Sequence, residues 1–143
     1  MPAKFRWNAR RRRFVERARV AHLATANRGA RPYVVPICFA LSSNLLYTAI
    51  DLKPKIQDAP NLRRLRNIAE NPHVTVIVDC YSENWKRLAF VLLHGRASLT
   101  DAREARRAIR LLRAKYPQYR AMALEGRPII KIRLTSAYAW GDL

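Results

Sequence analysis

The sequence predicts a mainly β protein with peripheral helices, built on an antiparallel six-stranded sheet that curls into a small barrel. Two observations predict this class. Several segments of strand length are rich in Val, Ile and Leu, and some alternate with polar residues. The first three of these segments are joined by short turns rather than by helices, which is typical of antiparallel sheets and not of βαβ folds. We interpret residues 1–143 as one domain, in which residues 1–19 form a basic helical leader.

The six expected strands are rich in β-branched and aromatic residues and lie between turn-forming sequences. Asn27-Arg28-Gly29 and Ser42-Ser43-Asn44 are expected to form turns, because Asn and Gly tolerate a positive φ. Gly95 interrupts the longest strand. Pro36 lies inside the second strand, where it marks a bulge or a position whose backbone needs no donor. The expected strands are residues 20–25, 33–41, 45–50, 73–80, 88–99 and 129–134.

Three segments are expected to form helices outside the barrel. In the second, Leu62, Leu65 and Ile68/Ala69 recur at three- and four-residue spacing, as the apolar side of an amphipathic helix does. That helix stops before Pro72, since proline disfavours helical geometry in the residue before it. Asp101 is a suitable N-cap for the third helix. The expected helices are residues 8–19, 61–70 and 101–115.

The charge is strongly positive: 28 Lys and Arg stand against 10 Asp and Glu, which gives +18 in 143 residues. Such a charge first suggests a nucleic-acid partner. The excess lies in the leader, around residues 63–66 and along residues 103–115. In the last two groups the arginines share their segment with an apolar stripe. Two interpretations therefore stay open for them, a solvated helix surface and an anion-binding surface.

Several classes of protein are excluded. No run approaches the roughly 18 apolar residues of a membrane span, and the basic leader lacks the apolar block of a secretory signal, so we expect a cytoplasmic protein without membrane contact. Cys38 and Cys80 are too few for a disulfide framework or a zinc site. The four glycines cannot form a nucleotide-binding loop, and the three histidines lack metal-ligand spacing. If the protein is an enzyme, a bound cofactor is expected to carry its chemistry.

One short stretch has the composition of a phosphate site. The third expected strand contains Thr48, and Lys53 and Lys55 follow it on the two sides of a proline. In an extended segment two residues spaced by two point to the same side. Two ammonium groups beside a hydroxyl are donors that one phosphate group can bridge.

The wider order of motifs carries a family resemblance. VPICF is followed by a turn and LYTAIDLKPK, then by LRRLRNIAENPHVTVIVD, an aromatic loop with Trp85, HGRA and a terminal RLTSAYAW. This succession resembles the pyridoxamine-phosphate-oxidase-like superfamily of flavin and deazaflavin enzymes, which fold as split β-barrels. The resemblance covers residues 20–140 and is most specific over residues 62–79. Within the superfamily the chain looks most similar to small proteins that depend on the deazaflavin F420.

The resemblance implies a homodimer with two cofactor sites at the subunit interface, with F420 as the first choice of cofactor and FMN as the second. It implies three kinds of contact: residues along the ring system and the cofactor, a phosphate-binding pair, and nearby arginines that add positive potential. The ring and cofactor residues are Pro36, Ile37, Tyr47, Thr48, Ala49, Ile50 and Trp85. The phosphate pair is Lys53 and Lys55, and the arginines are Arg63 and Arg64.

Three functions are compatible with the sequence and with this resemblance. The first is an oxidoreductase that moves a hydride between F420 or FMN and a small unsaturated organic substrate. Oxidation of vitamin B6 is not expected, because the arginine-bearing segment that binds pyridoxal in the oxidase proper has no counterpart after Trp140. The second function is flavin or haem binding without turnover, since a fold does not fix a function. The third, nucleic-acid binding, is disfavoured because Tyr47, Tyr81, Trp85 and Trp140 do not form one stacking surface.

Overall fold

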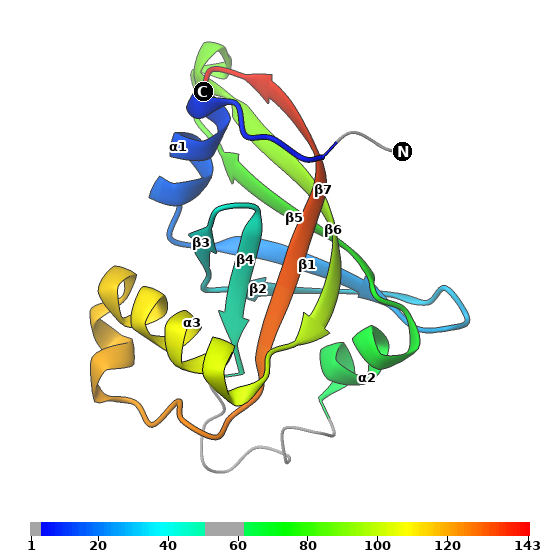
Figure 1. Cartoon of the computed structure of the whole chain (residues 1–143). Helices are drawn as coiled ribbons and strands as arrows, with labels where there is room; N and C mark the ends of the chain where they lie inside the picture. Colours follow the sequence, from blue (N-terminus) through cyan, green and yellow to red (C-terminus); the bar gives the residue numbers. More distant parts are fainter. Residues whose placement is uncertain (1–3, 51–61) are drawn as a thin grey trace.

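The computed structural model describes residues 4–50 and 62–143. In these residues seven antiparallel strands form one sheet in the order β2-β1-β5-β6-β7-β4-β3, and the sheet curls around a core (Figure 1). The predicted mainly β, antiparallel barrel with outer helices is confirmed, with one strand more than expected. The strands are Ala21–Ala26 (β1), Pro32–Ile37 (β2), Ala40–Ser42 (β3), Leu45–Ala49 (β4), His73–Cys80 (β5), Ala89–Leu99 (β6) and Ile129–Gly141 (β7).

The additional strand arises because the expected second strand, residues 33–41, is split. It breaks after Ile37, and the two parts lie at opposite edges of the sheet. At the break the amide of Phe39 donates to the Tyr116 hydroxyl at 3.1 Å instead of joining the ladder. The Phe39 ring is fully buried. The chain therefore crosses from one sheet edge to the other through this buried anchor.

Three α-helices lie outside the sheet, as predicted. They are Ala9–Arg17 (α1), Arg63–Glu70 (α2) and Ala102–Lys115 (α3). The Asn8 side chain accepts from the amides of Arg10 and Arg11 and so caps α1. The Asp101 carboxylate accepts from the amide of Glu104 and caps α3, as expected from the sequence. Short 3-10 helices follow at Trp85–Arg87 (η2) and Pro117–Ala121 (η3).

Two groups of buried side chains hold these elements together. The first fills the curled sheet and includes Leu23, Val76, Leu93 and Ile132. The second lies between α3 and the outer side of β3 and β4, and it includes Tyr47. Burying apolar area of this kind is the main favourable term in folding. It fixes α3 against β4, and β4 also lines the cavity described below.

Two details of the turns and strand ends differ from expectation. In the first turn the positive φ belongs to Ala30, at 62°, and not to Asn27 or Gly29; in the second it belongs to Ser43, at 54°. The last strand was expected to end at residue 134 but continues to Gly141. It continues because β6 pairs with β7 over its full length, with a register shift at His94/Gly95. The expected interruption at Gly95 thus lies opposite a β-bulge of β7, where Thr135 is the extra residue between the partners of His94 and Gly95.

Candidate functional site

A small cavity lies where β2, β4 and α2 meet. Its volume is 160 Å³. Five of the residues predicted from the sequence line it, together with three that no sequence pattern marks. The predicted residues are Pro36, Ile37, Thr48, Ala49 and Arg64, and the additional ones are Val20, Cys38 and Tyr119. Residues from five separate segments therefore converge on one place.

Among the described residues, Arg64 is the one cation that lines this cavity. Its Nε atom is buried and has no hydrogen-bond partner among the described residues. A buried cationic donor without a partner is costly, so this position is suited to an anionic group. The neighbouring Arg63 is exposed and does not line the cavity.

The position of Arg64 follows from the way α2 is anchored. Leu65 and Ile68 on one side of α2 pack into the core. Asn67, also buried, donates from Nδ2 to the Thr25 hydroxyl of β1 at 3.0 Å. Three anchoring residues within one turn of Arg64 fix the helix against the sheet. The guanidinium is thereby directed to a defined place rather than left on a mobile surface chain.

The third expected site strand, β4, divides its side chains between two sides. Thr48 and Ala49 line the cavity. Ile50 is fully buried in the barrel core. Tyr47 instead faces α3, where its hydroxyl donates to Glu104 Oε2 at 2.7 Å. Burial and this hydrogen bond raise the pKa of Tyr47, which keeps the phenol protonated. Its side chain is therefore a structural contact in this chain.

A further predicted site residue, Trp85, is not brought to the cavity within one chain. Trp85 lies in η2 and is 71 % exposed. Helix α2 precedes β5 and η2 follows it, so the two elements lie at opposite ends of a strand about 23 Å long at ~3.3 Å per residue. The predicted phosphate pair, Lys53 and Lys55, lies outside the residues that the structure describes.

Apolar side chains, three of them exposed and three half-buried, face outward from the sheet beside this cavity. We call this set the outer apolar surface; it consists of Val34, Ile77, Phe90, Leu92, Tyr138 and Trp140. The ring of Phe90 stacks on Trp140 at 5.9 Å between centroids and tilts against Tyr138 at 6.0 Å. Val34 is 63 % exposed and Tyr138 57 % exposed. Pro36 lies on the same strand and side as Val34 and also lines the cavity.

Comparison with known proteins decides the family. Residues 8–141 match the family described as pyridoxamine 5'-phosphate oxidase. The chain belongs to this family. The resemblance drawn from the order of motifs is confirmed, and the match spans all seven described strands. No curated protein is similar enough in sequence to match the chain.

Solved structures share the fold of this pyridoxamine 5'-phosphate oxidase family member at low sequence identity. An FAD-binding protein from Mesorhizobium loti is 22% identical, with a TM-score of 0.67, 93% of this chain and 94% of that chain covered. HutZ, the heme storage protein from Vibrio cholerae, is 14% identical, with a TM-score of 0.70 and coverages of 96% and 95%. A heme binding protein from Mycobacterium smegmatis is 16% identical, with a TM-score of 0.75; the match covers 96% of this chain and 55% of that one. These similarities establish the split-barrel fold.

Other kinds of site find little support in the described part of the chain. No group of three His, Cys, Asp or Glu there is placed to hold a metal ion. Within residues 4–50 and 62–143, none of the helices is both long enough and apolar enough to cross a membrane. The cavity at Arg64 is therefore the place where the predicted chemistry and the observed geometry coincide.

Proposed function

We propose that this protein is an oxidoreductase that binds F420 or FMN at the Arg64 cavity and transfers a hydride to or from a small unsaturated organic substrate. The observation that carries the proposal is the half-buried Arg64 side chain, whose buried Nε has no partner among the described residues. Both cofactors carry a phosphate, and an arginine fork suits phosphate oxygens. The family membership and the FAD-binding relative of the fold support a flavin-type ligand.

The cavity walls supply position rather than acid–base chemistry. Apart from Arg64, the lining consists of apolar groups, one hydroxyl, one thiol and one phenol. A bound flavin or deazaflavin supplies the hydride-transfer chemistry itself. Thr48 and Ala49 from β4 and Pro36 and Ile37 from β2 would then hold the ligand between two strands. Orientation of this kind lowers a barrier without a protein acid or base.

The site is proposed to be completed by a second copy of the chain. A volume of 160 Å³ is below the roughly 300–1,000 Å³ of sites that enclose a whole ligand. The outer apolar surface begins beside the cavity at Pro36. Because it exposes aromatic rings, we expect a partner chain to cover it. Such a homodimer would also offer the partner's aromatic residues to the cofactor, including the predicted ring contact made by the loop around position 85.

The test compares Arg64→Gln with Arg63→Gln. Both changes remove one charge from the same turn of α2, but only Arg64 lines the cavity. We expect the wild type to quench FMN fluorescence or to change F420 anisotropy on binding. Arg64→Gln should weaken binding about 10- to 100-fold, as loss of a charge-assisted hydrogen bond predicts, and Arg63→Gln should stay within about threefold.

Riboflavin, which lacks the phosphate, provides the ligand control. Wild type should prefer FMN to riboflavin, and Arg64→Gln should lose that preference. Turnover is then tested by following reoxidation of the reduced, protein-bound cofactor by a panel of enones and quinones. Failure of every flavin and deazaflavin to bind would overturn the proposal.

Haem binding without turnover is the second candidate, supported by the two heme-associated relatives of the fold. It predicts a Soret band on titration with haemin. A protein that shows this band and binds neither FMN nor F420 belongs to the second class.

A further inference from the structure

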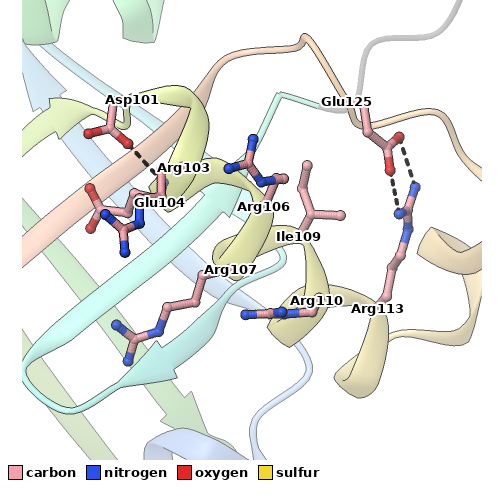
Figure 2. Close-up of a pocket in the computed structure, with 9 residues that line it drawn as sticks. All are labelled: Asp101, Arg103, Glu104, Arg106, Arg107, Ile109, Arg110, Arg113 and Glu125. Atoms are coloured by element: carbon pink, nitrogen blue, oxygen red, sulfur yellow. Dashed lines mark hydrogen bonds and ion pairs between the residues drawn. The ribbon is translucent and has the colours of Figure 1, made fainter.

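The outward side of α3 forms a cavity of 820 Å³ that shares no lining residue with the Arg64 cavity. Figure 2 shows arginine side chains extending from successive turns of α3 around it. Ile109 is its one apolar lining residue. Sites for ordinary small molecules are mainly apolar, so this composition is suited to an anion. The arginines are Arg103, Arg106, Arg107, Arg110 and Arg113.

The three acidic residues at this cavity are already engaged. Asp101 caps α3. Glu104 accepts from the Lys131 ammonium at 2.8 Å as well as from Tyr47. Glu125 pairs with Arg113 at 2.6 Å, as Figure 2 shows. The other four arginines of the cavity therefore have no acidic partner among the described residues, although Arg107 donates to the Ser42 hydroxyl.

The positive surface continues from α3 onto the sheet. Lys131, which bonds to Glu104 of the α3 cavity, also lines a neighbouring hollow of 170 Å³. Arg96 and Arg133 line the same hollow, and none of the described Asp or Glu residues does. These two arginines stand directly opposite each other on β6 and β7. We call the combined region the α3 basic surface; it comprises Arg103, Arg106, Arg107, Arg110, Arg96 and Arg133.

This arrangement is unfavourable for the protein on its own. Like charges directly opposite across two strands repel, and so do like charges three or four residues apart on a helix. The α3 basic surface contains both arrangements, and the described acids do not neutralise them. A ligand with regularly repeated negative charges would remove the repulsion along the whole surface.

We propose that the α3 basic surface binds the phosphate backbone of a nucleic-acid duplex. A duplex presents closely spaced phosphates that Arg contacts without reading the sequence. A compact anion would fill one hollow and leave the other unpaired. Insertion into a membrane needs exposed apolar side chains, and Ile109, the apolar residue of the larger hollow, is buried.

The lack of one aromatic stacking surface disfavours single-stranded nucleic acid but not a duplex. Single-stranded nucleic acid is held largely by stacking on aromatic rings, and no aromatic residue from the described part of the chain lines either hollow. A duplex keeps its bases stacked internally and is held by charge. The absence of a stacking surface thus favours a duplex over a single strand.

The test measures binding of a fluorescent 24-base-pair duplex by anisotropy between 50 and 200 mM salt. Six phosphate contacts predict a slope of log K against log salt of about −5, so affinity should fall roughly a thousandfold over this range. The triple variant Arg103→Gln, Arg106→Gln, Arg110→Gln should reduce the steepness of this slope by about 3. The matched control is Arg10→Gln, Arg13→Gln, Arg17→Gln on α1, which removes the same charge from three exposed positions and should change the slope by less than about 1.

Several outcomes would overturn the proposal. Equal effects of the two triple variants would mean that binding follows net charge and not the α3 basic surface. Tighter binding to a single strand of the same length would also contradict it, as would binding to phosphatidylserine vesicles without binding to the duplex. Circular dichroism checks that both variants are folded. FMN and F420 binding is measured alongside; because the two cavities share no residue, it should be unchanged in both variants.

Discussion

Lys115 is the residue whose surroundings differ most from what its charge requires. Its ammonium nitrogen is buried without a hydrogen-bond partner among the described residues. It lies 3.7 Å from the centre of the Phe39 ring and 5.3 Å from that of Tyr116. Burial, followed by the positive charge of Arg19, lowers the pKa of Lys115 to about 8. The two rings offset part of the lost hydration through cation–π attraction.

This pKa predicts an unusual dependence of stability on pH. Below pH 8 the folded protein holds a buried charge. From pH 8 upward the folded state releases the proton, while the unfolded state keeps it up to the ordinary pKa of 10.5. The unfolded state then binds more protons, so stability rises with pH.

Burial also raises the pKa of Tyr116, which opposes the rise above about pH 10. We expect a gain of about 1–2 kcal/mol from pH 8 to 10, reduced by the partial exposure of the side chain.

Urea unfolding at several pH values measures this gain. Lys115→Met keeps the apolar stem and removes the charge, so its stability should be flat between pH 8 and 10. Lys86→Met, at an exposed position in η2, should keep the rise of the wild type. A rise that persists in Lys115→Met would show that another group is responsible.

The order of motifs in the sequence predicts several of the residues that line the Arg64 cavity. Pro36, Ile37, Thr48, Ala49 and Arg64 were selected from the order of motifs, and the fold brings all five to one cavity. Tyr119 joins them from η3, far along the chain, and no local pattern marks it. From the sequence alone, Arg63 and Arg64 are equally good candidates for a cofactor-binding arginine. Only the rotation of α2 against β1 distinguishes Arg64, whose Nε is buried, from the exposed Arg63.

At the scale of elements, local patterns located strands better than they located strand partners. Residues 73–80 alternate regularly and form β5 with the predicted bounds. The break at Cys38–Phe39 could not be seen, because both residues favour strands and the Phe39 amide bonds to the distant Tyr116. The extension of β7 to Gly141 likewise depends on pairing with β6. The residues of one segment show its periodicity, but they do not show which distant strand it pairs with.

The bulge opposite Gly95 is an element-scale feature that the sequence did mark, and it predicts a large effect of adding one carbon. A Cβ at Gly95 would lie 2.5 Å from Ile132 Cγ2 and 2.8 Å from the Arg133 carbonyl oxygen. Since the second neighbour is backbone, Gly95→Ala should destabilise the fold by about 1–3 kcal/mol, as overpacking does. Urea unfolding measures the loss.

Gly29→Ala is the matched control for this change. Its Cβ would meet only Asn27 Oδ1, at 3.4 Å, and Gly29 has no positive φ. We therefore expect an effect near zero, or a gain of a few tenths of a kcal/mol from the stiffer unfolded chain. A similar loss in both variants would mean that the contacts at Gly95 are relieved by movement of β7.

For the whole molecule, the +18 charge and the apolar surface occupy different regions. Arg96 and Arg133 form one region with the arginines of α3. The outer apolar surface lies on the parts of β6 and β7 on the other side of the register shift at His94/Gly95. On β6 itself, outward-facing Phe90 and Leu92 give way to Arg96 beyond Gly95. The sequence revealed the total charge but not this division, because the division depends on which strand faces point outward.

The division predicts a homodimer through the outer apolar surface, with the charged region left free. Leu92 lies near the centre of this surface, opposite Tyr138. In a two-fold interface each copy contributes the same patch, so Leu92→Arg places two added charges in one apolar contact and should dissociate it. Leu99→Arg is the matched control, since Leu99 is on the same strand, is exposed, and lies at its far end. By light scattering, wild type and Leu99→Arg should have twice the chain mass of 16.6 kDa, and Leu92→Arg the single mass.

Because the Arg64 cavity is proposed to be completed by the partner, Leu92→Arg should also lose most of its FMN or F420 affinity while Leu99→Arg retains it. A monomeric wild type that binds cofactor tightly would contradict both the dimer and the shared site.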